Sequence, residues 1–263
     1  MPLKTTDFNW DVQINFSKNK SEVVELYKNI DILEDANTAG LSTTRNVFIK
    51  GEPYGVLYSK KILRDSLNRV VINKLTGLPL LDPQEGIIGD PNPDWLMGIR
   101  NEFSYKNISL SFLIDIRKGG DIFNGTAGVM KSVGTHTDTY NRDETVVFDG
   151  VFEDGTPNTI PVKWSSYYRA YSRPFIQELN IEDGSWLRLK ELGITYSVGK
   201  DQLGSLPIEG ISLGILGRNL LLLTDYSGVD PDTNLSGASN SVGRDYFNNP
   251  GTRSVLFNVK LIF

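Results

Sequence analysis

The sequence contains no cysteine and a single histidine among its 263 residues. The lack of cysteine excludes disulfides, thiolate metal sites and thiol nucleophiles. Any catalysis by histidine would depend on His136 alone, in the threonine-rich, turn-like stretch 135–139. Histidine becomes catalytic only with an oriented partner, so we expect a structural or solvated role for His136.

A basic excess and a long apolar run are also missing. The net charge of -5 and the pI near 5.1 argue against a nucleic-acid partner, which needs a basic surface to neutralise phosphates. No apolar run approaches the ~18 residues that a spanning helix requires, and residues 1–10 lack the apolar core of a signal peptide. For an exported protein, we therefore expect the natural N-terminus to lie upstream. A transmembrane β-barrel remains compatible with the mean hydropathy of -0.24, because lipid-facing and lumen-facing residues alternate and their hydropathies cancel.

Alternating apolar residues predict a strand at each end of the chain. The first covers residues 8–16, with Phe8, Trp10 and Val12 on one face. The last has one apolar face formed by Val255, Phe257, Val259, Leu261 and Phe263. An aromatic last residue after such a pattern looks like the signal that directs outer-membrane barrels to their assembly machinery. The alternative is an ordinary amphipathic strand of a soluble sheet.

Further strands are predicted between these two. The apolar residues occupy odd positions before Lys106-Asn107 and even positions after it. This change predicts a tight turn between two strands. Residues 45–50 and 55–63 form another predicted pair around residues 51–53. Residues 186–198 and 208–223 form a third pair, whose apolar parity slips near Gly193 and Arg218 and so indicates bulges. About eight strands are expected in all.

The predicted connections alternate in length. Short ones lie at residues 51–53, 106–107 and 199–207, and long ones at 21–44, 64–96, 118–184 and 224–251. Outer-membrane barrels have short periplasmic turns and long outward loops. The sequence therefore predicts an all-β fold, an antiparallel transmembrane β-barrel portion with Phe263 at the periplasmic rim.

Seven short strings resemble one family as a set. They are GDPNPDW at 89–95, NEFSYKN at 101–107, LSFLID at 110–115, GGDIFN at 119–124, GSWLRLK at 184–190, GRNL at 217–220 and YSGVDP at 226–231. In this order they resemble the barrel of SusC/RagA TonB-dependent outer-membrane transporters. The resemblance extends from about Phe8 to Phe263.

This resemblance implies a cell outer-membrane location and a ~22-stranded barrel with a plugged lumen. It implies import of oligosaccharides or peptides, energy from TonB, a SusD-like surface lipoprotein as partner, contact with outer-membrane lipid, and no cofactor, metal or catalytic site. Residues 1–263 match only the C-terminal segment of the barrel. The plug domain, the TonB-contacting segment and the earlier strands are expected to be absent from the chain.

An aromatic cluster in the longest outward loop is a candidate for ligand or lid contact. Trp164, Tyr167, Tyr168 and Tyr171 recur at near-helical spacing, and flat aromatic faces can stack on sugars or pack against a protein. The alternative, which we favour, is a short amphipathic helix folded onto the barrel mouth. In the second half of the chain, charged residues alternate with leucines. If Leu187 and Leu189 face lipid, we expect Arg188, Lys190 and Arg218 to face the lumen.

Two other classes of protein fit parts of the pattern. A secreted β-sandwich could bind carbohydrate through the aromatic loop, and an all-β glycosidase could use loop carboxylates such as Glu153 and Asp154. Asp230, Asp232 and Asn234 alternate like the ligands of a calcium loop, but the turn glycine and the closing glutamate are missing. These three residues are therefore expected to form a turn with local hydrogen bonds.

Overall fold

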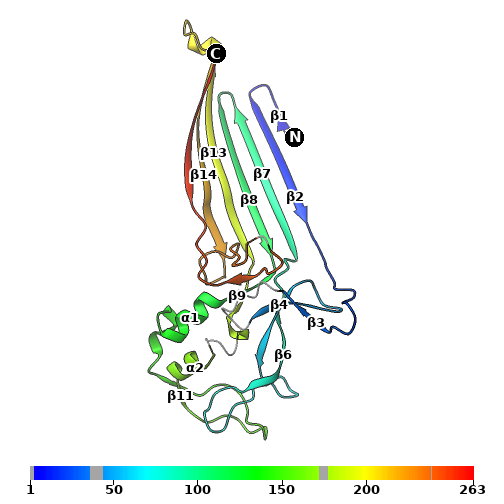
Figure 1. Cartoon of the computed structure of the whole chain (residues 1–263). Coiled ribbons are helices and arrows are strands. Elements are labelled where there is room, and N and C mark those ends of the chain that lie inside the picture. Colours follow the sequence, from blue (N-terminus) through cyan, green and yellow to red (C-terminus); the bar gives the residue numbers. More distant parts are fainter. Residues whose placement is uncertain (1–2, 36–43, 172–176, 238) are drawn as a thin grey trace.

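One large antiparallel sheet dominates the fold (Figure 1). The computed structural model describes residues 3–35, 44–171, 177–237 and 239–263. The sheet has seven strands in the order β1-β2-β7-β8-β13-β14-β16, and we call it the wall. Its strands are β1 (Leu3–Lys4), β2 (Phe8–Ser17), β7 (Trp95–Tyr105), β8 (Ile108–Lys118), β13 (Trp186–Gly199), β14 (Gly210–Thr224) and β16 (Ser254–Ile262).

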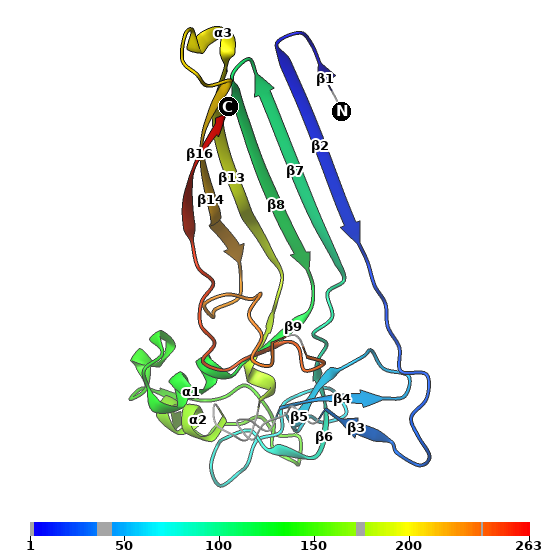
Figure 2. The ribbon, with the colours of Figure 1, turned by 45° about the horizontal axis from the view of Figure 1, so that its top comes forward.

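Short connections lie at one end of the wall and long ones at the other (Figures 1 and 2). Lys106 and Asn107 alone join β7 to β8, with Tyr105 opposite Ile108 and Lys106 at φ 50°. The segment with α3 (Lys200–Leu203) joins β13 to β14 at the same end. Residues 18–94, 119–185 and 225–253 connect the strands at the opposite end. This arrangement confirms the predicted sorting for the connections at 106–107 and 199–207. We call the two ends the turn end and the loop end.

Two predicted wall strands lie elsewhere. Residues 45–50 and 55–63 do form strands, β4 (Arg45–Ile49) and β5 (Val56–Ile62), but these pair with β3 (Ile32–Glu34) and β6 (Leu81–Gly89) in a separate four-stranded sheet. Val47, Val56 and Leu57 are buried there, as suits a sheet covered by other loops. The prediction placed them wrongly because the apolar residues 47–49 and 56–58 and the turn between them indicate two strands but not the sheet that the strands join. The turn at 51–53 is therefore not at the turn end, and residues 18–94 form one long connection.

A β-bulge shifts the register between β13 and β14. Leu189 lies opposite Leu221, whereas Glu191 lies opposite Arg218, so the ladder shifts around Lys190 and Asn219. Asn219 has a left-handed backbone, φ 52°. The predicted bulges near Gly193 and Arg218 are thus confirmed as irregularities of the strand pairing. In β13 the irregularity lies at Lys190, three residues before Gly193. Because the bulge changes the parity, leucines on both sides of it share one face of the wall.

The three long connections fold together at the loop end (Figure 2), and we call them the loop assembly. In addition to the four-stranded sheet, this region contains the sheet β12-β9-β15 and the pair β10-β11. Its other elements are β9 (Asp121–Asn124), α1 (Gly125–Val133), η1 (Thr137–Asn141), β10 (Thr145–Val146), β11 (Val162–Lys163), α2 (Trp164–Tyr171), η2 (Glu178–Asn180), β12 (Ile181–Asp183) and β15 (Arg244–Asp245). Among the helices described, none has both the length and the apolar character to cross a membrane.

Buried apolar side chains concentrate in the loop assembly. In the described part of the chain, Trp186 is the single buried apolar residue of the wall. The others belong to the long connections: Val47, Val56, Leu57, Ile62, Val71, Ile72, Ile122, Phe123, Ala127, Val151, Phe152, Tyr168 and Tyr226. The wall therefore has no covered core of its own.

Candidate functional site

The wall has one apolar face that is open to the surroundings. Strand pairing places Ile14 beside Ile99, and Ile99 beside Ile114, in one row across β2, β7 and β8. Ile14 is 61% exposed and Phe257, in β16, is 76% exposed. Exposed apolar surface of this extent marks an interaction surface, and a face that is apolar from strand to strand fits lipid.

The predicted assembly strand belongs to this face. Phe257, Val259 and Leu261 lie opposite Ile215, Leu213 and Ile211 of β14, and Val255 lies opposite Gly217. Phe263 follows β16 and is 82% exposed. None of these side chains is packed in a covered core. Their role as an assembly signal stays a prediction.

Aromatic residues lie near both ends of the apolar face. At the loop end, the rings of Phe16 and Trp95 have centroids 6.0 Å apart. At the turn end, Trp10 stacks on Phe103 at 5.7 Å, and Tyr105 is exposed beside them. Barrels in outer membranes carry such aromatic girdles where the apolar band meets water.

A polar residue, Asn101, lies within the apolar face. Asn101 lies between Val12 and Phe112 in the cross-strand row, where an unpaired amide would be costly in lipid. The indole Nε1 of Trp10 donates a hydrogen bond to Asn101 Oδ1 at 3.1 Å. This bond satisfies part of the amide's hydrogen-bonding capacity and so lowers the cost.

The opposite face of the wall carries a network of charges. Lys190 Nζ lies 2.8 Å from Asp115 Oδ2. Glu191 lies 3.0 Å from Arg100 and 3.6 Å from Arg218 through its two oxygens. The predicted placement of Lys190 and Arg218 away from the apolar face is confirmed, and a polar inner face is what a barrel lumen requires.

Arg188 joins the wall to the third long connection. It is 6% exposed and makes two hydrogen bonds to Asp230, at 3.1 and 2.6 Å. Its guanidinium also lies over the Trp186 ring, 4.9 Å from the centroid. The prediction of a turn is confirmed at Asp230, which accepts a bond from the Asp232 backbone NH at 2.9 Å. Both Asp230 oxygens are thus used inside the protein.

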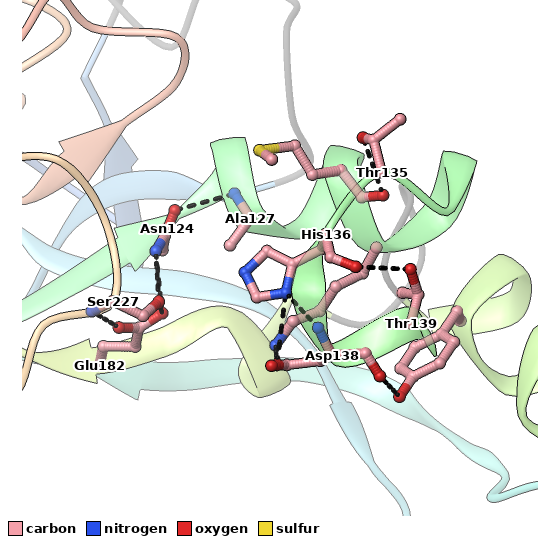
Figure 3. Close-up of polar contacts among 11 residues, drawn as sticks. Asn124, Ala127, Thr135, His136, Asp138, Thr139, Glu182 and Ser227 are labelled. Carbon is pink, nitrogen blue, oxygen red and sulfur yellow. Dashed lines mark hydrogen bonds and ion pairs between the residues drawn. The ribbon is translucent and has the colours of Figure 1, made fainter. Parts of the chain in front are cut away.

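A polar cluster around the buried Asn124 joins the second and third long connections (Figure 3). The amide nitrogen of Asn124 donates to Glu182 Oε1 at 2.9 Å and to Ser227 Oγ at 3.1 Å. Its oxygen caps α1 by accepting from the Ala127 backbone NH at 2.9 Å. The backbone NH of Ser227 donates to Glu182 Oε2 at 2.7 Å. Asn124 is fully buried, so these bonds are expensive to lose.

A second buried cluster lies beside it. Tyr226 Oη donates to Asp245 Oδ2 at 2.7 Å, and Thr126 Oγ1 donates to Asp245 Oδ1 at 3.0 Å. Burial raises the pKa of the Tyr226 phenol, and the bond to Asp245 raises it further. The phenol therefore stays protonated and continues to donate to the carboxylate. Sequence reasoning missed both clusters, although the strings at 119–124 and 226–231 contain Asn124 and Tyr226.

His136 caps a short helix. Its Nδ1 accepts a hydrogen bond from the Asp138 backbone NH at 3.2 Å, at the start of η1 (Figure 3). The carbonyl oxygen of His136 accepts from Thr139 Oγ1 at 2.6 Å. These contacts fit the expected structural role.

The predicted aromatic cluster is packed against itself on α2. Trp164 stacks on Tyr168 at 5.6 Å, and Tyr167 lies 4.6 Å from Phe148, between ring centroids. Tyr168 is buried and donates from Oη to the Asp138 carbonyl oxygen at 3.0 Å. Burial raises the pKa of Tyr167 to about 12. The side chain of Tyr171 lies outside the described part. The packing supports the amphipathic-helix interpretation, and contact of these rings with a ligand or a lid protein stays a prediction.

The carboxylates considered for glycoside hydrolysis lie at an exposed loop. Asp154 Oδ2 contacts Lys74 Nζ at 2.5 Å, and Oδ1 accepts from Thr156 Oγ1 at 2.6 Å. The bonds from Lys74 and Thr156 hold the pKa of Asp154 well below its usual value. Such a carboxyl stays ionised at neutral pH and does not suit a general acid.

Comparisons with known proteins agree with this geometry. No protein-family model matches the chain. The chain is 26% identical to TonB-dependent receptor P3 of Formosa agariphila, over 99% of the chain and 27% of that protein. It is 27% identical to TonB-dependent receptor P26 of the same organism, over 88% of the chain and 24% of that protein. The chain thus spans about a quarter of the length of these relatives.

Solved structures show the same fold. The chain resembles a chain in the structure of the RagAB peptide transporter with a TM-score of 0.65 and 18% identity, over 98% of this chain and 28% of that one. A structure of the RagAB peptide importer in an open-open state matches with a TM-score of 0.64 and 19% identity, over 99% of this chain and 27% of that one.

The wall and its connections define a portion of an outer-membrane β-barrel. The curated relatives and the shared fold together confirm the resemblance to TonB-dependent receptors of the SusC/RagA type. The chain is accordingly localised to the cell outer membrane.

Proposed function

We propose that residues 1–263 form the C-terminal segment of the barrel of a TonB-dependent importer of oligosaccharides or peptides. In this proposal the plug domain and the earlier strands belong to other parts of the receptor. The observation that carries the proposal is the wall itself, because its two chemically opposite faces suit lipid on one side and a watery lumen on the other. The names of the relatives support the transport class.

The loop assembly is the proposed outward surface of the importer. A SusD-like lipoprotein would cover it, and TonB would act through the part of the receptor outside this chain. The secreted β-sandwich is less consistent with the structure, since a sandwich covers its apolar faces and Phe257 and Val259 are exposed. We infer no catalytic role, because the carboxylates considered are held in a surface turn and His136 caps a helix.

Uptake by cells tests the proposal. A strain lacking the intact receptor is compared with the complemented strain for uptake of labelled oligosaccharide mixtures and labelled peptides, with and without the proton gradient. Uptake of one class that requires both receptor and gradient is the expected result. Equal uptake by the two strains for both classes would contradict the importer proposal.

The lid partner is tested separately by purifying the tagged receptor from outer membranes in mild detergent. A surface lipoprotein is expected to copurify with the wild type. Trp164→Ala removes a ring that packs on Tyr168, and Phe257→Ala, on the lipid face, is the matched control. Loss of the lipoprotein with both variants or with neither would contradict a lid contact through the aromatic helix.

A further inference from the structure

A glycine interrupts the polar face of the wall near the loop end. Gly98 lies inside β7, opposite Asn15 of β2 and Asp115 of β8, and neither strand pairing shifts its register there. Glycine weakens the interior of a strand, so it commonly marks a bulge or a place where another group approaches closely. Because the pairing is regular, a bulge does not explain Gly98.

The described chain leaves the space above Gly98 empty. A Cβ atom there would meet Asp115 Oδ1 at 3.9 Å and Leu113 Cδ1 at 4.0 Å, which are ordinary contacts. On the same face, a Cβ atom at Gly193 would meet Ser111 Oγ at 3.1 Å, which is tighter than an ordinary contact. Gly193 therefore makes room for its neighbour, whereas Gly98 leaves room for a group from outside the described chain.

The space above Gly98 is a hollow of about 340 Å³, which is within the size range of small-ligand sites. Strand register places most of its lining side chains on the polar face: Asn15 and Ser17 of β2, Leu96 of β7, and Leu113 and Asp115 of β8. Lys190 of β13 also lines the hollow, and its ion pair with Asp115 holds it on the same face. Phe16 and Met97 alternate with these residues along β2 and β7, so their side chains lie on the apolar face. The hollow therefore opens on the side of the wall away from lipid.

The hollow presents both donors and acceptors of hydrogen bonds. Lys190 Nζ donates to Asp115 Oδ2 at 2.8 Å, and an ammonium group has three donors. Among the described residues, Asp115 Oδ1 has no hydrogen-bond partner, and neither have the side chains of Asn15 and Ser17. The ion pair leaves the lining without a net charge, so the hollow suits a neutral ligand.

Two leucines add aliphatic surface to the same hollow. Leu96 and Leu113 lie on the polar face at its border, and Leu96 is 40% exposed. A sugar unit matches this combination, because its hydroxyl groups both donate and accept and its ring carries C–H groups. A peptide matches it less well, since a bound peptide main chain pairs with free backbone groups of a strand. Here β7 and β8 are paired along both of their edges.

The hollow lies at the end of the wall that adjoins the loop assembly. Ser17 is the last residue of β2 and Leu96 is the second residue of β7. Figure 2 shows β2 and β8 ending toward the loop assembly, which is the proposed outward surface. A molecule that enters from that side meets the hollow early on its way along the polar face.

We propose that this hollow is a subsite for one neutral sugar unit of an imported oligosaccharide. Lys190 and Asp115 form hydrogen bonds to its hydroxyl groups from one side and Asn15 from the other, while the two leucines contact its C–H groups. The subsite rests on the proposed import function and selects oligosaccharides over peptides as the substrate class.

Binding of the detergent-purified intact receptor to arrays of neutral oligosaccharides, acidic oligosaccharides and peptides tests the subsite. Gly98→Leu fills the hollow. Asp115→Asn/Lys190→Gln removes both charges with little change of shape. This double variant tests the subsite even if Gly98→Leu does not fold, because a partly exposed ion pair contributes little to stability.

Two control variants match these changes outside the hollow. Ser104→Leu adds the same side chain on the polar face of β7, toward the turn end. Asp154→Asn/Lys74→Gln removes an exposed ion pair of the loop assembly. Resistance to trypsin in detergent shows which of the four variants are folded.

The wild type is expected to bind at least one neutral oligosaccharide. Both test variants are expected to weaken that binding about tenfold, as for the loss of about one hydrogen bond to a charged group, and the controls are expected to leave it unchanged. Failure to bind any neutral oligosaccharide, or wild-type affinity in either folded test variant, would overturn the subsite. Receptor-dependent uptake by cells would still support the importer in that case, so the two proposals fail separately.

Discussion

The wall and the loop assembly are stabilised in opposite ways. The wall relies on hydrogen-bonded strand ladders and leaves its apolar side chains exposed to the surroundings. The loop assembly buries apolar side chains, and polar clusters around the buried Asn124 and Asp245 join its segments. The wall therefore requires lipid to be stable, whereas the loop assembly has the covered core of a water-soluble domain.

The link between the two regions is the most sensitive point. Arg188→Met leaves Asp230 buried without its cation, and removal of one partner of a buried ion pair costs about 3–5 kcal/mol. We expect the third long connection to detach from the wall, as measured by faster proteolysis of residues 225–253 in the purified receptor. The control variant Arg188→Met/Asp230→Leu removes both charges, and most of the resistance to proteolysis should return in it. Equal damage in the single and double variants would show that the pair does not form the link.

A charge on the lipid face has the next largest effect. Phe112→Arg places a cation in the apolar row of β8, which costs about 2–4 kcal/mol near the middle of the bilayer. Ser111→Arg, one position away on the polar face, should cost far less. The free energy of unfolding of the lipid-reconstituted receptor, from urea titration, measures both. Similar losses would argue that the two faces do not differ in environment.

The buried phenol of Tyr226 is expected to stabilise the loop assembly and not the wall. Tyr226→Phe removes a hydrogen bond to the carboxylate of Asp245, and a hydrogen bond to a charged group contributes about 1.5–3 kcal/mol. Hydrogen exchange is expected to increase in β9, β12 and β15 and to stay unchanged in β7 and β8. An increase in the wall as well would contradict independent stabilisation of the two regions.

The same residue gives a pH dependence with a defined sign. Burial and Asp245 raise the pKa of Tyr226, so above its unfolded value of about 10 the unfolded chain loses this proton and the folded chain keeps it. The contribution is complete below pH ~10 and is lost as pH rises beyond it. Protection of the loop assembly against hydrogen exchange should therefore fall as the pH rises above about 10. The fall should be smaller in the Tyr226→Phe variant. An equal fall in both would assign the effect to other groups.

The sequence predicted the wall better than the loop assembly for a physical reason. Alternation in residues 8–16 and 255–263 reports directly on a sheet with two different environments. β4 and β5 instead carry consecutive apolar residues, at 47–49 and 56–58. Such a run indicates a strand but not the sheet that the strand joins. The clusters around Asn124 and Asp245 include bonds between residues 103 and 119 positions apart, Asn124 to Ser227 and Thr126 to Asp245. No local pattern encodes such contacts.

The strings that carried the family resemblance have a structural explanation. Those at 119–124, 184–190 and 226–231 contribute Asn124, Arg188, Tyr226 and Asp230 to the contacts among the long connections and the wall. The string at 89–95 contributes Asp90, whose backbone NH donates to Asp121 at 2.8 Å. These four strings therefore mark the junction at which loops join the barrel, whereas those at 101–107, 110–115 and 217–220 lie mainly within β7, β8 and β14.

Lipid exposure of the last strand tests the central claim most directly. The chain has no cysteine, so Val259→Cys and Asn258→Cys each place one fluorescent label within these residues, on opposite faces of β16. In the lipid-reconstituted receptor, we predict that a lipid-phase quencher acts on position 259 and a water-soluble quencher on position 258. Quenching of position 259 from water, with no effect of the lipid quencher, would contradict a membrane-facing wall.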